Sequence, residues 1–146
     1  MKKTVAFLLL SILAACGDEI GPKTVFWTIG PMVHINFGKG SIKPSLALEG
    51  AAWIDFFFGM DAGVEIEKGK ARIYYEFQTG LVFFGLSMGS VCEFASERDA
   101  AAVGFQTSLW GACFGGGDLR YRRIDGRNYF CPGAFVKYVT PIPHGM

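Results

Sequence analysis

Apolar and polar residues alternate with a period of two through most of the chain after Pro22, and no stretch of useful length repeats with a helical period. In the segment ARIYYEFQTGLVFFGLSM, residues 71–88, Arg72, Glu76 and Gln78 recur at even spacing among apolar and aromatic residues. Successive side chains of a β-strand point to opposite faces, so this spacing puts the three polar side chains on one face. The pattern predicts an all-β fold whose strands each have an apolar and a polar face.

Dipeptides that end in glycine separate the alternating segments and predict two-residue hairpin turns. Three of them are Lys39-Gly40, Lys68-Gly69 and Thr79-Gly80. Pairing the residues across each turn produces one continuous apolar face. Across the second turn Glu65 opposes Arg72, a favourable pair on the polar face. Across the third turn Phe77 is predicted to oppose Val82.

Further strands are predicted at residues 82–94, 100–114, 119–123 and 129–139. The last two are joined at Asp125-Gly126, which is a strong type I′ turn signal. The connection near residues 55–57 has no clear turn chemistry, but the alternation resumes after it. We therefore predict eight strands in an antiparallel up-and-down meander, a size that closes into a small β-barrel.

The composition of the polar face indicates which face lies inside the barrel. Charged residues make up 18% of the chain, and residues 77–91 and 100–117 contain none. The polar face is poor in lysine and rich in glycine, alanine and serine, unlike a solvated surface. We expect the apolar face to contact lipid and the polar face to fill a narrow interior as a stabilising plug. The expected interior polar cluster consists of Asp61, Glu65, Arg72, Glu76 and Gln78.

Two points about this arrangement stay open at the level of the sequence. Asp61 opposes Glu76, which requires that one carboxyl is protonated or that both share Arg72. The alternative fold is a soluble calycin-like barrel that is tethered by a lipid and holds a small apolar ligand. In that fold the aliphatic face is the interior, and Ile73 and Leu86 are buried.

The N-terminal segment MKKTVAFLLLSILAAC has two lysines, an apolar run and small residues before Cys16. It is too short to span a bilayer and indicates a targeting segment. Leu13-Ala14-Ala15-Cys16 resembles the bacterial lipoprotein signal, which implies cleavage after residue 15 and lipidation of Cys16. Ordinary signal cleavage nearby is the alternative. Gly17 follows the cysteine, and the resemblance then implies sorting to the outer membrane.

The predicted organisation is a signal peptide at residues 1–15, a tether at 16–23, a β-barrel at 24–140 and a tail at 141–146. The final strand contains GAFVKY, residues 133–138, which is similar to the terminal signal of outer-membrane barrels. The chain as a whole resembles the small eight-stranded bacterial outer-membrane β-barrel proteins. The resemblance implies an outer-membrane location, lipid-anchored or integral, with membrane lipid as the partner and a structural or interaction role.

The sequence has few features that indicate nucleic-acid binding, metal binding or a cofactor. A net charge of +1 does not indicate a nucleic-acid partner. Beyond Cys16, the cysteines Cys92, Cys113 and Cys131 have no metal-ligand spacing. We therefore predict no metal, no cofactor and no intrachain disulfide. Gly115-Gly116-Gly117 lacks the residues of a phosphate-binding loop and is interpreted as a flexible turn.

One residue pair and one basic cluster remain as candidate sites, and each also has a simpler structural interpretation. His34 opposite Ser45 would suit a base and a nucleophile of an outer-membrane lipid-modifying enzyme. No third acid is expected beside His34, so an interior hydrogen bond is the preferred interpretation and we predict that the protein is not an enzyme. The basic cluster at residues 120–123 would contact anionic headgroups at a membrane rim or, as preferred, form a solvated loop.

Overall fold

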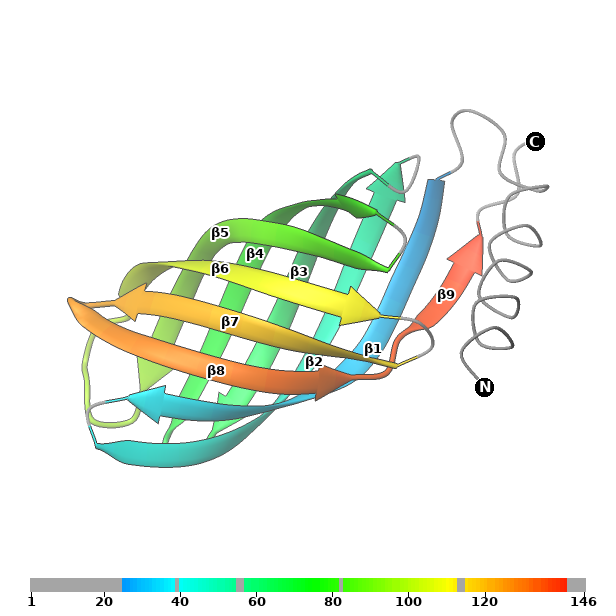
Figure 1. The fold of residues 1–146 in the computed structure, drawn as a ribbon. Coiled ribbons are helices and arrows are strands. Elements are labelled where there is room, and N and C mark those ends of the chain that lie inside the picture. Colours follow the sequence, from blue (N-terminus) through cyan, green and yellow to red (C-terminus); the bar gives the residue numbers. More distant parts are fainter. Residues whose placement is uncertain (1–24, 39, 55–56, 82, 113–114, 142–146) are drawn as a thin grey trace, which may run out of the picture.

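The computed structural model describes residues 25–38, 40–54, 57–81, 83–112 and 115–141. These residues form one antiparallel sheet in which neighbours in sequence are neighbours in space, and β1 pairs with both β2 and β8 (Figure 1). The strands are β1 (Val25–Gly38), β2 (Ser41–Ile54), β3 (Phe58–Glu67), β4 (Lys70–Leu81), β5 (Phe84–Ala95), β6 (Ala102–Ala112), β7 (Gly116–Ile124), β8 (Arg127–Phe135) and β9 (Tyr138–Pro141). The predicted closed eight-stranded up-and-down barrel is confirmed, with β9 as a short extension. No helix among the described residues is long and apolar enough to cross a membrane.

The ninth strand continues the eighth. Met32 pairs with Phe135 in β8 and Ile29 pairs with Tyr138 in β9. The two paired segments therefore both advance by three residues, and the register is unbroken. The gap lies opposite Pro31, which has no N–H to donate to the ladder. The amide of Val136 still donates to the Pro31 carbonyl oxygen at 3.2 Å. The single last strand predicted from the sequence is therefore present, interrupted by one proline on its neighbour.

Two of the predicted hairpins have the register expected from the sequence. Val64 opposes Ile73 and Glu65 opposes Arg72 across Lys68-Gly69, and His34 opposes Ser45 between β1 and β2. Gly40 and Gly69 have φ values of 74° and 80°. At the β7–β8 turn Asp125 and Gly126 have φ values of 50° and 68°, as a type I′ turn requires.

The predicted turn at Thr79-Gly80 is wrong. β4 continues to Leu81, which pairs with Phe84, and Phe77 opposes Met88 rather than Val82. The glycine has no positive φ and instead permits a close approach of the strands, because a Cβ on Gly80 would lie 2.6 Å from Gly85 Cα and from the Phe84 carbonyl oxygen, and 3.1 Å from the indole of Trp110. The partner of Phe77 moves by an even number of residues, so every side chain keeps its predicted face.

Glycine at position 85 is required by the same indole. A Cβ on Gly85 would overlap Trp110 and the Thr79 carbonyl oxygen, whereas a Cβ on Gly111 would lie 3.5 Å from the nearest atom. We expect Gly85→Ala to lower the free energy of unfolding by about 1–3 kcal/mol through overpacking, and Gly111→Ala to leave it nearly unchanged. Urea unfolding of the refolded barrel in micelles measures both. Equal effects of the two substitutions would contradict this packing.

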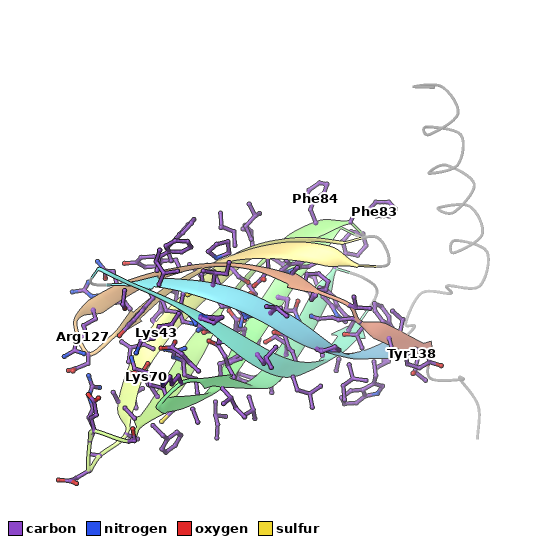
Figure 2. The ribbon with its side chains drawn as sticks, turned by 90° about the horizontal axis from the view of Figure 1, so that it is seen from below. Lys43, Lys70, Phe83, Phe84, Arg127 and Tyr138 are labelled. Atoms are coloured by element: carbon purple, nitrogen blue, oxygen red, sulfur yellow. The ribbon has the colours of Figure 1, made fainter. Side chains whose placement is uncertain are left out.

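The barrel has two distinct ends. The turns at Gly40, Gly69 and Asp125-Gly126 lie at one end, which we call the mouth, and β9 lies at the other, which we call the base (Figure 1). Figure 2 shows Lys43, Lys70 and Arg127 toward the mouth and Phe83, Phe84 and Tyr138 toward the base. Inside the base, the Phe26 ring stacks on Trp53 at 6.1 Å, and Trp110 packs edge-on against Trp53 at 5.4 Å.

The apolar face of the sheet is the outer surface of the barrel. Ile73 is 53% exposed and Leu86 is 54% exposed, and large apolar side chains surround the barrel on every strand from β1 to β8. The inner face carries the buried charged and polar residues. The soluble alternative with an aliphatic interior is therefore wrong for this fold.

Candidate functional site

The interior of the barrel is filled by two groups of ion pairs. The group nearer the mouth, which we call the upper network, surrounds the fully buried Glu65. Glu65 Oε1 accepts from Arg72 Nη1 at 2.8 Å and from Arg122 Nη1 at 2.9 Å, and Arg122 Nη2 also donates to Glu65 Oε2. Arg72 also bonds Glu67 and Glu93, each at 2.9 Å. These bonds join β3 to β4 and β5 along the wall and to β7 across the interior.

The second group, which we call the lower network, surrounds Glu49 on β2. Glu49 Oε2 accepts from the Tyr74 hydroxyl at 2.8 Å and from Arg120 Nη2 at 3.0 Å. Lys137 projects inward from the gap between β8 and β9 and donates to Glu49 Oε1. The Arg120 guanidinium lies over the Tyr74 ring at 4.5 Å and pairs with Asp118 at 3.3 Å. This number of donors balances the negative charge of a buried carboxylate.

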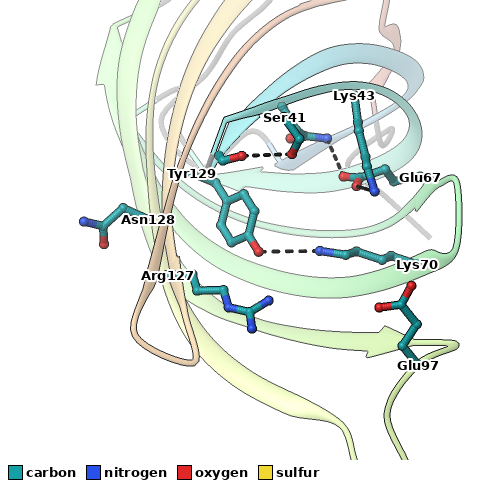
Figure 3. A pocket seen from close by; sticks show the side chains of 10 residues that line it. Ser41, Lys43, Glu67, Lys70, Glu97, Arg127, Asn128 and Tyr129 are labelled. Carbon is teal, nitrogen blue, oxygen red and sulfur yellow. Dashed lines mark hydrogen bonds and ion pairs between the residues drawn. The ribbon is translucent and has the colours of Figure 1, made fainter.

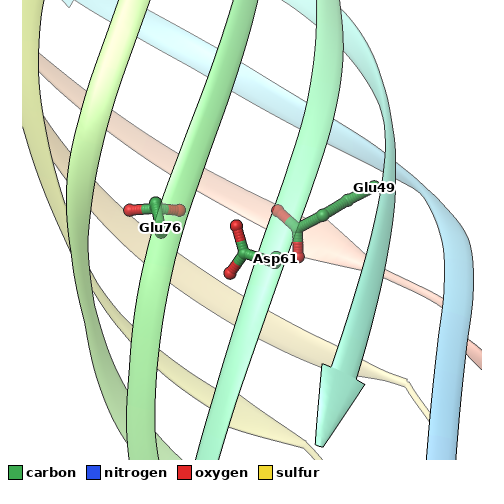
Figure 4. A group of neighbouring side chains, drawn as sticks. All are labelled: Glu49, Asp61 and Glu76. Carbon is green, nitrogen blue, oxygen red and sulfur yellow. The ribbon is translucent and has the colours of Figure 1, made fainter.

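Three carboxyl groups meet beside the lower network. Glu49, Asp61 and Glu76 each have an oxygen within 4.8 Å of the others, and all three are buried (Figure 4). Arg120 is 3.5 Å from Glu76, so Arg120 and not Arg72 is the cation that two of these acids share. Among the described residues the carboxyl group of Asp61 has no hydrogen bond or ion pair, and its Oδ1 is buried. A metal ion would fit this spacing, but Lys137 and Arg120 already contact Glu49.

The unequal environments of these acids give a test of the interior. We expect Asp61→Asn to leave the free energy of unfolding unchanged or to raise it, because the substitution removes a buried carboxyl that has no cation of its own. Thermal unfolding in micelles at neutral pH measures this. A loss of stability of several kcal/mol would contradict the placement of Asp61.

The sequence-predicted interior cluster is placed inside the barrel in full. Asp61, Glu65, Arg72, Glu76 and Gln78 are all buried, and Arg72 contacts Glu65 directly. Glu76 belongs to the lower network, where its Oε1 accepts from Ser87 at 3.1 Å. Gln78 Nε2 has no hydrogen-bond partner among the described atoms.

Several interior residues were missed by sequence reasoning. Arg120 and Arg122 are fully buried in β7, so both the solvated-loop and the membrane-rim interpretations are wrong for them. Their spacing with Asp118, separated by the outward Leu119 and Tyr121, is the same alternation that identified the other strands. Gly116 and Gly117 likewise belong to β7 and not to a flexible turn.

The His34–Ser45 pair does not form a base and a nucleophile. Ser45 Oγ accepts from Asn36 Nδ2 at 2.9 Å. His34 Nε2 lies 3.1 Å from Asp118 Oδ1, so an acid does lie beside this histidine, contrary to expectation. Both His34 and Ser45 are buried inside the barrel, away from the face that carries the apolar side chains. The geometry therefore supports an interior polar contact.

A polar cavity of about 190 Å³ lies at the mouth, between the turns of the hairpins (Figure 3). Lys43, Lys70 and Arg127 line it from three strands, together with Glu67, Glu97 and Tyr129. Lys70 Nζ is 3.5 Å from the Tyr129 hydroxyl and 3.4 Å from Glu93.

The cysteines add no site that the structure describes. Cys92 and Cys131 are free thiols, and Cys131 is fully buried inside the barrel. Cys113 and the expected lipidation site Cys16 lie outside the described residues.

No protein-family profile and no curated protein matches this chain. Solved structures do match. A de novo designed transmembrane β-barrel aligns with a TM-score of 0.54 and 9% identity over 82% of this chain and 99% of its own. The designed barrel TMB2.3 aligns with a TM-score of 0.52 and 6% identity over 81% and 96%. The Yersinia pestis outer membrane protein Ail, in a phospholipid bilayer nanodisc, aligns with a TM-score of 0.49 and 9% identity over 80% and 99%. At these identities the two designed barrels show a shared fold.

Proposed function

We propose that this protein is a small outer-membrane β-barrel with a structural or interaction role and a closed polar interior. The observation that carries the proposal is the continuous outer surface of large apolar side chains around a barrel whose inner face is charged. Such a surface is not stable in water, because contiguous apolar patches of this size cause association. In a bilayer the same surface contacts lipid. A closed barrel can lie there because its backbone groups are hydrogen-bonded between its own strands.

The filled interior supports a role other than that of a general pore. Arg120 and Arg122 are fully buried in ion pairs that cross from one side of the barrel to the other, and the fully buried Arg72 pairs with Glu65 on the neighbouring strand. The rings of Phe26, Trp53 and Trp110 pack inside the base. Charged side chains in a barrel lumen are tolerated when they are paired, and here they also join the walls.

The proposal includes a lipid anchor and an orientation. Both ends of the described chain, Val25 in β1 and Pro141 in β9, lie at the base, because Phe26 pairs with Pro141. After cleavage of a signal peptide at residues 1–15, a lipidated Cys16 and a short tether at 16–23 would hold the base near the inner leaflet. The mouth, with its short turns, would then face away from the cell.

The three tryptophans provide the test. Trp27 is 54% exposed on the outer face, whereas Trp53 is buried and Trp110 packs against it inside. After reconstitution in bilayers that contain lipids with brominated acyl chains, we expect strong quenching of the wild-type fluorescence. In Trp27→Phe most of this quenching should be lost. The Trp53→Phe/Trp110→Phe variant, with Trp27 alone, should be quenched most strongly. Equal fractional quenching of these variants would contradict the placement of the apolar face in lipid.

A further inference from the structure

We propose that the mouth cavity binds a tetrahedral oxyanion, a phosphate or sulfate group, between Lys43, Lys70 and Arg127. The cavity is lined by cations from β2, β4 and β8, so three separate strands of the wall converge on one volume (Figure 3). That volume, about 190 Å³, is large enough for a small anionic group and too small for a folded domain. This site does not depend on whether the outer face of the barrel contacts lipid.

The mouth cations differ from the interior arginines in how they are paired. Arg72, Arg120 and Arg122 each bond a carboxylate at 3.0 Å or less. At the mouth, Lys70 reaches Glu93 only at 3.4 Å and Lys43 reaches Glu67 only at 3.9 Å. The Arg127 guanidinium has no hydrogen bond or ion pair among the described residues, and the residue is exposed at the cavity edge. Donors of the three cations are therefore available to a ligand.

The acids around the cavity do not cancel these charges equally. Glu67 is buried, and its Oε2 is bound by Arg72 at 2.9 Å and by Asn36 at 3.0 Å, so its charge is largely committed to the upper network. Glu97 is exposed on the opposite edge and has no partner among the described residues. The cavity thus has three cations facing one free carboxylate.

A hydroxyl donor completes the cavity. The Tyr129 hydroxyl lies beside Lys70 and faces the cavity, whereas the Ser41 hydroxyl donates to the Gly38 carbonyl oxygen and Asn128 Oδ1 accepts from Tyr121 outside the cavity (Figure 3). Two lysines and an arginine with the tyrosine hydroxyl match the acceptor oxygens of an oxyanion, and the guanidinium offers a bidentate contact. A carboxylate has fewer acceptor oxygens and would leave donors unused.

Inorganic phosphate is the first probe. The full barrel, refolded in an uncharged maltoside detergent, is titrated with phosphate against chloride of equal ionic strength, and backbone amide shifts in the NMR spectrum are followed. We expect saturable shifts at Ser41, Lys70 and Asn128 and none at Phe84 or Gly116 near the base. Arg127→Gln should weaken binding about tenfold, and Glu97→Gln should strengthen it roughly threefold.

The matched control is Arg123→Gln, which removes the same charge from an exposed arginine on the same hairpin that does not line the cavity. It should leave the phosphate affinity unchanged. Shifts that fail to saturate, or affinities that fall equally in the Arg123 and Arg127 variants, would overturn the proposal, and so would weaker binding in Glu97→Gln.

A second arm identifies the source of the oxyanion. The barrel is placed in phosphatidylcholine nanodiscs with and without phosphatidic acid, in phosphate-free buffer. Mouth shifts that appear with phosphatidic acid support a lipid phosphate as the ligand, whereas mouth shifts seen only with soluble phosphate support a free oxyanion. Absence of mouth shifts in both arms would overturn the site.

Discussion

Replacing Glu65 with glutamine should lower the free energy of unfolding by about 3–5 kcal/mol, because it leaves buried arginines without their carboxylate. Glu65 is fully buried, and both of its oxygens accept from Arg122. Arg72 keeps Glu67 and Glu93 after the substitution, whereas Arg122 keeps, among the described residues, its hydrogen bond to Gln106 at 2.8 Å and no carboxylate. The uncompensated charge on Arg122 therefore accounts for most of the loss. Urea unfolding in micelles measures this loss, and the heat-dependent shift of the folded band monitors the fraction that is folded.

A double variant separates the ion pair from the fold. Glu65→Gln with Arg122→Gln removes both charges, so we expect it to be more stable than Glu65→Gln alone. Glu97→Gln, on the exposed mouth edge, is the control and should unfold like the wild type. If the two single losses simply add in the double variant, the residues do not interact and the interior is packed differently.

Replacing Leu48 with arginine should lower the free energy of unfolding from a bilayer by about 2–4 kcal/mol. Leu48 lies near the middle of β2 on the outer face and is 56% exposed. In the proposed membrane the arginine would lie at mid-depth in hydrocarbon, where its charge is poorly solvated. Unfolding from vesicles in guanidinium chloride measures the change.

Ile42 is the matched control for this depth effect. It lies on the same strand and the same outer face, but next to the mouth, where the structure places the turn after β1. Ile42→Arg should cost about 0–1 kcal/mol, because the charge reaches the interface. Equal costs at the two positions would mean that the outer face does not cross a bilayer.

The alternation of residues was sufficient to predict the barrel, because a period of two fixes the face of every side chain once one turn is known. The error at Thr79-Gly80 shows how far this extends. Pairing Phe77 with Met88 instead of Val82 keeps each residue on its predicted face, so the wrong turn did not change the inside. Gly80 and Gly85 lie opposite each other within the paired strands, close to the indole of Trp110, so the glycine read as a turn residue is a packing residue.

The interior contacts were only partly predictable. Glu65 and Arg72 are neighbours across one hairpin, so local register was enough to pair them. The bonds from Arg122 to Glu65 and from Arg120 to Glu49 cross the barrel, and they depend on how the closed sheet is staggered. His34 meets Asp118 for the same reason, which is why no acid was expected beside it. Lys137 enters the interior at the gap opposite Pro31, a break that the alternation does not reveal.

We propose above that the apolar outer face of this barrel is embedded in a membrane. Extraction of isolated outer membranes with alkaline carbonate, followed by electrophoresis of unboiled and boiled samples, tests it most directly. We predict that the protein stays with the membrane and that its folded band shifts on boiling. The same is expected of a variant that has a cleavable signal peptide and serine in place of Cys16. Release of that variant into water as a folded, monomeric protein would contradict the claim.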